Sequence, residues 1–455
     1  MKFHPSFLSV AIAVSLLTAI PGVAQDAASS GDATSSASDT SSPQAGSFSD
    51  LSTATGDADE ALLQTTEADS SGFFFPGGFG YLPETVASLG GFDLAPPISY
   101  SLTLSQGYND NVYNRSRSSS ARRGSMTTSL MLGTNVLLSN ARNFLSLNLE
   151  LGGKYYWDIN KQSIRPHARI SLAHAFKINP RATLSTRLSG GYFDQPDFSR
   201  PGAPTRANSG DYLDLDGHTS LSYRWAPRFS TVTSFGFATT VYHENEWRGS
   251  DYLSLHVGQS FNFHLAPTVT TVLDTRYKIT EYDDSGRNTQ TEYLLAGFDF
   301  QLSPKLTGSA RGGAEFRQYR SAGARDGVSP FGEFSLGYRF AQGSHLQWFN
   351  RYGYEDGVAG RQKNHSLRTG LQVSHVITPR ISARLGGSYS YQTITNFPSN
   401  NEYDQHLFTG NVGLDFTITR SLKLFTSYRF NAVIYDTDES NYHRNEVNVG
   451  ATLTF

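Results

Sequence analysis

The chain has 455 residues, with 37 Lys and Arg against 40 Asp and Glu, which gives a formal net charge of −3. It contains no cysteine, so disulfide scaffolds and thiolate metal centres are excluded. Only 38% of the residues are hydrophobic, and no stretch approaches the ~18 consecutive apolar residues that a membrane-spanning helix needs. A protein that crosses a membrane with helices is therefore excluded too.

Three segments of different composition precede the main part of the chain. Residues 1–24 combine Lys2, a short apolar run and small residues before position 25, which is typical of a secretory signal peptide. Residues 25–72 contain nine acidic residues and no Lys or Arg, and we expect a disordered acidic leader there. Residues 73–97 are rich in Phe, Gly and Pro, which favours a linker or a plug.

From residue 98 to the C-terminus, hydrophobic residues recur with a period of two. In the last stretch Val447, Val449, Ala451, Leu453 and Phe455 share one face, and mainly polar residues share the other. Such alternation indicates β-strands, because successive side chains of a strand point to opposite sides of a sheet. Each strand therefore separates an apolar environment from a polar one.

Short turns and longer polar loops alternate between these strands. Turns are predicted near Asn140, Pro180, Pro227, Pro267, Pro304, Gln342, Pro379 and Arg420. Together with a first strand at about 99–109 and a last strand ending at Phe455, they predict 18 strands. Sixteen strands remain an alternative, if one hairpin is an excursion of a loop. The pattern predicts an all-β, antiparallel, up-and-down transmembrane barrel over residues 98–455, with short periplasmic turns and longer extracellular loops.

Aromatic residues lie near both ends of the predicted strands, where the two interfaces of a bilayer would be. Those near the turns are Phe176, Trp225, Phe263, Phe300, Phe340 and Phe416. Those near the loops are Trp157, Tyr192, Tyr242, Tyr354, Tyr391 and Tyr435. The alternative is the ordinary preference of aromatic residues for strands in a soluble barrel.

Two short motifs resemble features of known outer-membrane proteins. The phrase Tyr108-Asn109-Asp110-Asn111-Val112-Tyr113, at the end of the first strand, resembles the start of the putative β-barrel porin 2 family. The resemblance covers about residues 98–455 and implies an outer-membrane pore or scaffold, without catalytic residues to transfer. Some members of that family are associated with exopolysaccharide export. The final alternation Val449, Ala451, Leu453 and Phe455 resembles the C-terminal signal that the barrel-insertion machinery reads.

The polar face of the strands would line an aqueous lumen, since 18 strands enclose more space than side chains can fill. Without Lys2 and the acidic leader, 36 basic and 31 acidic residues remain. Arginine rings in pores favour anions. The candidate selectivity residues lie in the middle of strands and are Arg187, Arg311, Arg351, Arg368, Arg384 and Arg429. The alternative is that inward basic and acidic residues pair and keep the lumen hydrated without selecting a solute.

No motif supports an enzyme, a metal centre or a cofactor. Asp214, Asp216 and His218 share one inward face, but neighbours on one face of a strand are ~7 Å apart, too far for a compact ligand shell. His256 and His264 share a face at a separation that prevents cooperation. Acidic loops such as 283–288 lack the spacing of a calcium loop and are interpreted as turns.

Three functions therefore compete. The first is a porin-like channel for hydrophilic solutes through a mildly positive lumen. The second, motivated by the resemblance, is an outer-membrane component of exopolysaccharide export. The third is a structural or adhesive surface barrel. The expected partners are outer-membrane lipid, the insertion machinery, and a solute or polysaccharide, without nucleic acid. The oligomeric state stays open.

Overall fold

A computed structural model describes residues 98–455 except for short gaps, almost all in the longer loops. The gaps are 117–118, 121, 141, 160–162, 195–210, 244–250, 284–285, 287, 321–325, 356–361, 397–400 and 437–440. The predicted signal peptide (1–24), acidic leader (25–72) and Phe/Gly/Pro-rich segment (73–97) lie outside the described residues.

Eighteen β-strands make up the described part of the chain. In chain order they are β1 Ile98–Asn109, β2 Ser125–Ser139, β3 Asn143–Tyr156, β4 Ile164–Asn179, β5 Ala182–Phe193, β6 Tyr212–Ala226, β7 Phe229–Tyr242, β8 Tyr252–Ala266, β9 Val269–Tyr282, β10 Thr289–Ser303, β11 Leu306–Tyr319, β12 Gly327–Ala341, β13 Ser344–Glu355, β14 Gln362–Thr378, β15 Ile381–Asn396, β16 Glu402–Thr417, β17 Leu422–Tyr435 and β18 Tyr442–Thr454.

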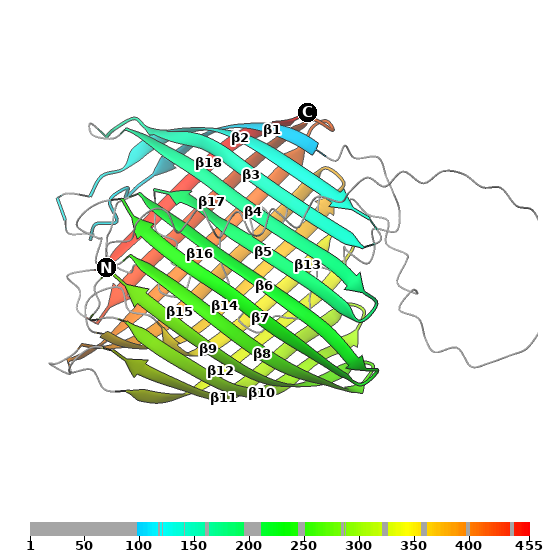
Figure 1. Ribbon diagram of the computed structural model, residues 1–455. Helices are drawn as coiled ribbons and strands as arrows, with labels where there is room; N and C mark the ends of the chain where they lie inside the picture. Colours follow the sequence, from blue (N-terminus) through cyan, green and yellow to red (C-terminus); the bar gives the residue numbers. More distant parts are fainter. Residues whose placement is uncertain are drawn as a thin grey trace, which may run out of the picture. The chain divides into compact units, whose positions relative to one another are not determined.

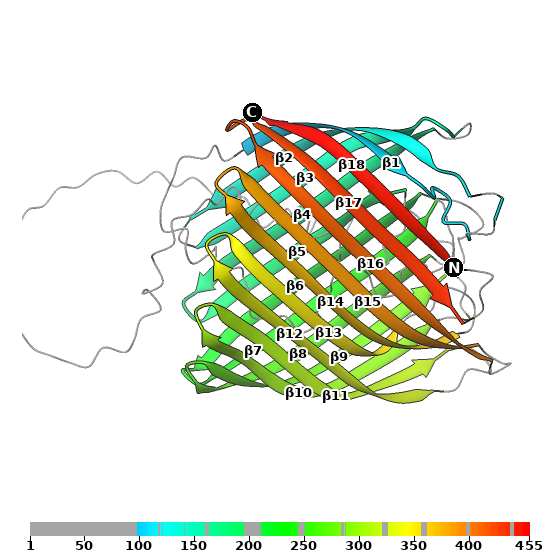
Figure 2. The same ribbon diagram turned by 180° about the vertical axis from the view of Figure 1, so that it is seen from behind.

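Each strand pairs antiparallel with the strands before and after it, and the sheet closes on itself (Figures 1 and 2). Closure is made by β1 and β18, whose register runs from Ser101 opposite Thr454 to Asn109 opposite Glu446. A closed sheet leaves no strand edge without partners, which is what a lipid environment demands. The prediction of an 18-strand up-and-down barrel is confirmed. Among the described residues no helix is long and apolar enough to span a membrane.

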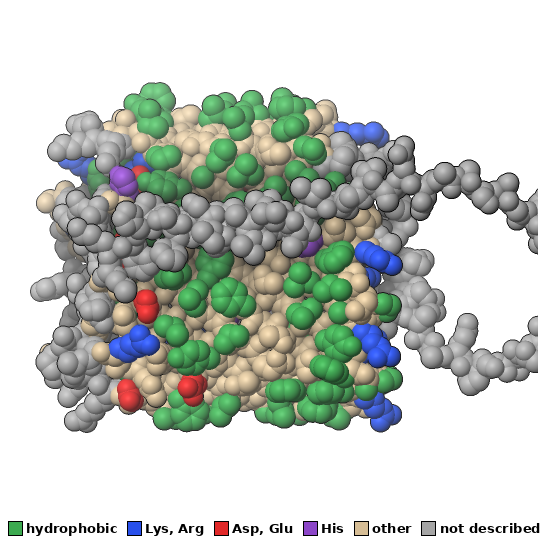
Figure 3. All heavy atoms as spheres, in the orientation of Figure 1, with side chains coloured by type: hydrophobic (Ala, Val, Ile, Leu, Met, Phe, Trp, Pro, Cys, Tyr) green, Lys and Arg blue, Asp and Glu red, His purple; other side chains and the backbone are tan. Residues whose placement is uncertain are grey.

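The outer surface of the barrel carries the apolar half of the alternation (Figure 3). Large hydrophobic side chains stand exposed on every part of the wall, as the exposed fractions of Leu132 (60%), Phe298 (50%) and Val449 (57%) illustrate. A water-soluble protein rarely exposes so much contiguous apolar surface. The outer face therefore requires hydrocarbon around it, which agrees with the predicted membrane location.

The inner surface carries the polar half, and many of its side chains are buried among one another. Buried inward residues include Glu315 (0% exposed), Arg368 (2%) and Gln405 (0%). Buried charges are tolerated only when they are paired or hydrogen-bonded. The inner wall is therefore organised by ion pairs rather than by an apolar core.

Five of the eight short turns are capped in the same way, by a side-chain oxygen that accepts a backbone N–H two residues later. In the turn after β4, Asn179 Oδ1 accepts the backbone N–H of Arg181 at 2.8 Å. In the turn after β14, Thr378 Oγ1 likewise accepts the N–H of Arg380 at 3.3 Å. Asn, Ser and Thr stabilise turns in this way because their side chains replace a backbone acceptor two residues later. The repeated phrases in the sequence are thus tight turns between strands, as predicted, and most of them are capped.

The aromatic belt is confirmed at the turn end and partly wrong at the loop end. Trp225 is 60% exposed and Phe263 is 41% exposed on the outer surface near the turns. At the loop end, Tyr242 (7% exposed) and Tyr354 (1%) are buried, and Tyr435 packs against an inner cluster that contains Leu407. These three tyrosines do not face lipid, and the prediction was wrong for them because it considered only their proximity to the loops.

Candidate functional site in the lumen

All six arginines predicted to line the lumen belong to the inward half of their strands. Three of them share a register row across β11–β14, in which Arg311 lies opposite Glu333, Glu333 opposite Arg351, and Arg351 opposite Arg368. Like charges directly opposite each other in a sheet are destabilising. The Arg351–Arg368 neighbourhood therefore needs acidic residues on both sides, and Glu333 and Glu355 supply them.

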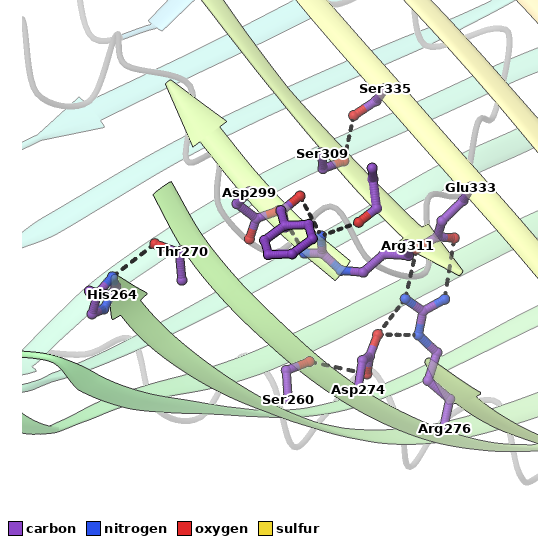
Figure 4. Close-up of polar contacts among 12 residues, drawn as sticks. Ser260, His264, Thr270, Asp274, Arg276, Asp299, Ser309, Arg311, Glu333 and Ser335 are labelled. Carbon is purple, nitrogen blue, oxygen red and sulfur yellow. Dashed lines mark hydrogen bonds and ion pairs between the residues drawn. The ribbon is translucent and has the colours of Figure 1, made fainter. Parts of the chain in front are cut away.

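The centre of this charged region is an ion pair between strands that are not neighbours (Figure 4). Arg276 of β9 donates from Nη2 to Glu333 Oε1 of β12 at 2.8 Å, passing over the inner faces of β10 and β11. The same guanidinium is bonded to Asp274, which also accepts from Ser260 Oγ at 3.1 Å. Next to this bridge lies the apolar cluster Tyr293, Leu295 and Phe331, since Tyr293 is paired opposite Arg276 and Leu295 opposite Asp274. At this place the side-chain bridge therefore forms a second layer over the strands of the lumen wall.

Several of the predicted arginines are neutralised by direct ion pairs. Arg311 Nη2 lies 2.6 Å from Asp299 Oδ1, and Arg368 Nη2 lies 3.1 Å from Glu355 Oε2. Arg384 Nη2 lies 2.9 Å from Asp415 Oδ2, which Lys423 also approaches at 3.2 Å. Arg351 instead lies with its guanidinium 5.4 Å from the centre of the Phe331 ring. The alternative of charge pairing thus describes Arg311, Arg368 and Arg384.

The charges that remain exposed in the lumen are basic. Among the described inward-facing strand residues, the exposed charged side chains are Lys177, Arg187, Arg224, Arg339 and Arg429, whereas each inward Asp and Glu is buried or half-buried. A carboxylate can accept two or more hydrogen bonds, so a buried Asp or Glu that is paired with Arg or Lys has its hydrogen-bonding capacity filled. The exposed charges of the lumen wall are therefore positive, and among the described strand residues the inward basic side chains also outnumber the inward acidic ones.

Side chains replace part of the backbone ladder between β12 and β13. The pairing of these strands ends at Gly332 opposite Tyr352, although β12 continues toward the loops. Tyr354 N then donates to Glu315 Oε2 of β11 at 2.9 Å, and Arg317 Nη1 donates to Glu355 O at 3.1 Å. The end of β13 is therefore held over the inner face of β12 by residues from β11.

Proline marks the positions where strands separate. Pro330 lies in the part of β12 that has left β13, and Pro166 lies in β4 before its pairing with β5 begins at Ala168. Proline lacks the N–H that a central strand donates, so it is confined to edges and irregularities of sheets. Both prolines were visible in the sequence and could have predicted these separations.

The predicted inward row Asp214, Asp216 and His218 is confirmed as a face, and it is not a ligand shell. Asp214 accepts from Thr240 Oγ1 at 2.7 Å, and Asp216 accepts from Ser189 Oγ at 2.8 Å. His218 Nδ1 lies 3.4 Å from Nε2 of His256 in β8, with the two rings stacked. No group of three or more metal-binding side chains occurs among the residues that the structure describes.

The histidine pair was missed because β6 and β8 are separated by β7. The register places His218 opposite Gly236 of β7, and Gly236 opposite His256. A Cβ atom on Gly236 would lie 2.2 Å from the His256 ring. The absence of a side chain at Gly236 is thus what lets the rings meet, and a glycine between two inward histidines was the signal to find.

The phrase that carries the family resemblance forms a compact hook after β1. Asn111 Nδ2 donates to His443 O at 2.9 Å, and Arg444 Nη1 donates to Asn114 Oδ1 at 2.9 Å. Asp110 accepts from the backbone N–H of Asn445 at 2.7 Å. Val112 is fully buried against inward Tyr156. The hook therefore ties the first loop to β18, beside the strand pair that closes the barrel.

A cluster of polar side chains lies at the loop end of β3–β6. Tyr156 OH donates to Asp194, and Arg165 Nη1 lies 3.9 Å from Asp211 Oδ1. Burial raises the pKa of Asp211 above its ordinary value, and the charge of Arg165 opposes that change. The carboxyl groups here hold the ends of strands together.

The residues of the predicted insertion signal lie on the outer surface. Val449, Leu453 and Phe455 are 57%, 43% and 69% exposed, and Ala451 shares their face. Phe455 exchanges two backbone hydrogen bonds with Tyr100, each of 2.9 Å, which fixes the C-terminus to β1. Recognition of this segment by the insertion machinery stays a prediction.

Comparison with known proteins places the barrel among porins. The family model described as "Putative beta-barrel porin 2" matches residues 87–455. No curated protein matches the chain. Similar solved structures include the outer membrane protein opdK from Pseudomonas aeruginosa, at 11% identity with a TM-score of 0.42, covering 79% of this chain and 99% of that one. A BenF-like porin from Pseudomonas fluorescens Pf-5 matches at 9% identity with a TM-score of 0.42, covering 80% of this chain and 100% of that one.

Proposed function

Because the chain belongs to the putative beta-barrel porin 2 family, we propose that it is an outer-membrane channel that passes hydrophilic solutes and prefers anions. As a member of a porin family, the protein is an outer-membrane β-barrel and not an enzyme. Family membership does not specify the solute or a preference for anions. These parts of the proposal rest on the charges of the lumen. The predicted selectivity residues form part of that proposal.

The observation that carries the proposal is the difference in exposure between bases and acids. Arg187 of β5 and Arg429 of β17 are exposed in mid-strand, whereas Glu333, Asp415 and Glu446 are buried. A pore wall of low dielectric focuses the field of exposed charges on the water within it. Anions should therefore be enriched in the lumen relative to cations, as in other pores lined by arginine.

Ion selectivity in planar bilayers tests the proposal. With a KCl gradient across the membrane, the reversal potential of the full chain should indicate preference for chloride. The double variant Arg187→Gln/Arg429→Gln should move the permeability ratio toward that of a neutral pore. The matched control is Arg320→Gln, whose guanidinium lies 3.7 Å from Glu281 and is about half exposed near the loops. Absence of conductance, or cation preference in the unmodified protein, would contradict the proposal.

Export of a polysaccharide is the second candidate, and an arc of inward aromatic side chains favours it. The ring centres of Phe193 and Tyr212 are 5.8 Å apart, and those of Tyr212 and Tyr242 are 5.7 Å apart. On the next two strands the ring centres of Tyr252 and Tyr282 are 5.6 Å apart. Flat apolar rings with a polar edge suit sugar rings. Tyr212, Tyr242 and Tyr282 are only 7%, 7% and 8% exposed, so Phe193 and Tyr252 are the rings of the arc that could contact a polymer. A deletion strain that secretes an unchanged amount of polymer would remove this candidate, while leaving the channel proposal intact.

A further inference from the structure

The short turns at one end of the barrel carry basic side chains at equivalent positions. Six of the eight turns contain one, and these residues are Arg142, Arg181, Arg228, Lys305, Arg380 and Arg420. None of the eight turns contains an Asp or a Glu. The longer loops at the opposite end contain 15 acidic and 12 basic residues. The two ends of the barrel therefore differ in charge.

Capping side chains fix the backbone in five of these six turns, and the basic residue lies at the tip. The N–H of Arg142 is donated to Asn140 Oδ1 at 3.0 Å, and the N–H of Lys305 is donated to Ser303 Oγ at 3.2 Å. The C=O of Arg181 accepts from Arg224 N at 2.8 Å, which ties the same residue to the next strand. The backbone is thus held while the side chain extends beyond it.

The six cations are exposed and have no ion pair with any described acidic residue. Figure 3 shows Lys and Arg side chains gathered along the rim at the right of the view, next to the hydrophobic outer wall. Each turn joins two neighbouring strands, so successive tips lie on the order of 10 Å apart around the rim. At this spacing the six cations form a ring of separated charges and not a single cluster.

An apolar residue on the outer surface accompanies the cation in most of these turns. Ile178, Leu302 and Ile377 are 48%, 62% and 52% exposed, and each lies three residues before the basic residue of its turn. Trp225 stands in the same relation to Arg228 and is 60% exposed. An apolar side chain followed by a cation suits the boundary between hydrocarbon and headgroups, where Lys and Arg extend toward phosphate.

We propose that these six turn-tip cations form a ring that binds the phosphate groups of anionic phospholipids in the periplasmic leaflet. The turn end is assigned to the periplasm because outer-membrane barrels have short turns on that side. A basic residue near an anionic membrane surface contributes about 1 kcal/mol, and Arg can hold phosphate oxygens with two donors. The ring would fix the depth of the barrel in the membrane, independently of what the channel passes.

Lipid selection around the purified full chain tests the proposal. The protein is reconstituted in vesicles of equal phosphatidylglycerol and phosphatidylcholine, and spin-labelled forms of each lipid report the motionally restricted fraction. The unmodified protein should restrict phosphatidylglycerol about fivefold more strongly. In the variant with all six cations changed to Gln, this ratio should fall to about one. Because surface charges are screened, salt should lower the ratio of the unmodified protein as well.

Matched variants distinguish the rim from the lumen and a lipid from a free anion. The triple change Arg187→Gln/Arg339→Gln/Arg429→Gln removes exposed lumen cations and should leave the ratio unchanged. If the sixfold variant does not assemble, the double variant Arg181→Gln/Arg228→Gln should still lower the ratio measurably. An unchanged ratio in the rim variants, or a loss in the lumen variant, would overturn the proposal. So would release of the lipid by millimolar inorganic phosphate at constant ionic strength.

Discussion

Arg276 of β9 and Glu333 of β12 form an ion pair of 2.8 Å although two strands separate them in the barrel wall. Both side chains are buried, with side-chain exposures of 5% and 4%. The pair therefore connects the wall across the lumen side, in a way that neighbouring strand pairing does not. Its integrity should matter for both the stability and the shape of the lumen.

Replacing Glu333 with Gln should destabilise the barrel by roughly 3 kcal/mol, because Arg276 loses a charged partner while it stays buried. Asp274 remains bonded to Arg276 and limits the loss. Denaturant unfolding of the protein in lipid vesicles measures the change. In the double variant Arg276→Gln/Glu333→Gln the loss should be smaller than the sum of the single losses, and strict additivity would show that the pair does not couple the two strands.

Adding a methyl group at Gly236 should separate the His218 and His256 rings. Because the new Cβ would lie 2.2 Å from the His256 ring, Gly236→Ala should cost about 1–3 kcal/mol of stability. Gly312→Ala is the matched control, since nothing lies within 4 Å of a Cβ atom at that strand position. We expect the control to change the unfolding free energy by less than about 0.5 kcal/mol. Equal losses in both variants would contradict this account of the histidine contact.

The hook after β1 depends on the backbone of Asn114, which has a φ of 50°. Residues with a Cβ atom adopt this left-handed region at a cost, and Asn tolerates it better than Ala. Asn114→Ala also removes the acceptor of Arg444 and should destabilise the hook by about 1–3 kcal/mol. Asn114→Gly removes the same acceptor without the conformational cost. Proteolysis of intact cells should therefore cleave the first loop faster in the Ala variant than in the Gly variant.

Removal of the terminal aromatic side chain should reduce assembly more than stability. Phe455→Ala is expected to lower the amount of folded barrel in the outer membrane several-fold, because the terminal residue belongs to the predicted insertion signal. Phe416→Ala provides the comparison, since Phe416 is an outward aromatic residue at the same end and is 43% exposed. Heat-modified migration in gels measures the folded fraction. A similar loss in both variants would indicate a general effect of lipid-facing aromatics.

Strand number, strand parity and the turn positions could be predicted because each depends on local sequence. The alternation of Val447, Val449, Ala451 and Leu453 is read directly as an outward face, and the Pro turns mark where strands reverse. The six lumen arginines followed from the same parity. A local pattern thus sufficed wherever the environment changes from one residue to the next.

Contacts within the lumen could not be predicted in the same way. Arg276 meets Glu333, and His218 meets His256, because the curvature and tilt of the closed sheet bring together side chains from strands that are not neighbours. The parity of a strand gives the side that a residue faces and not its height in the barrel. For the same reason, the sequence identified which arginines point inward without showing that Arg311 and Arg384 are neutralised there.

The union of β1 with β18 has a consequence for how the protein is made. Without the thirteen residues of β18, both β1 and β17 would have an edge without backbone partners. A chain without β18 would therefore be an open sheet with two unpaired edges, whose backbone groups lipid cannot satisfy. Closure of the barrel therefore depends on β18, and a chain that lacks this strand should expose edges that favour aggregation.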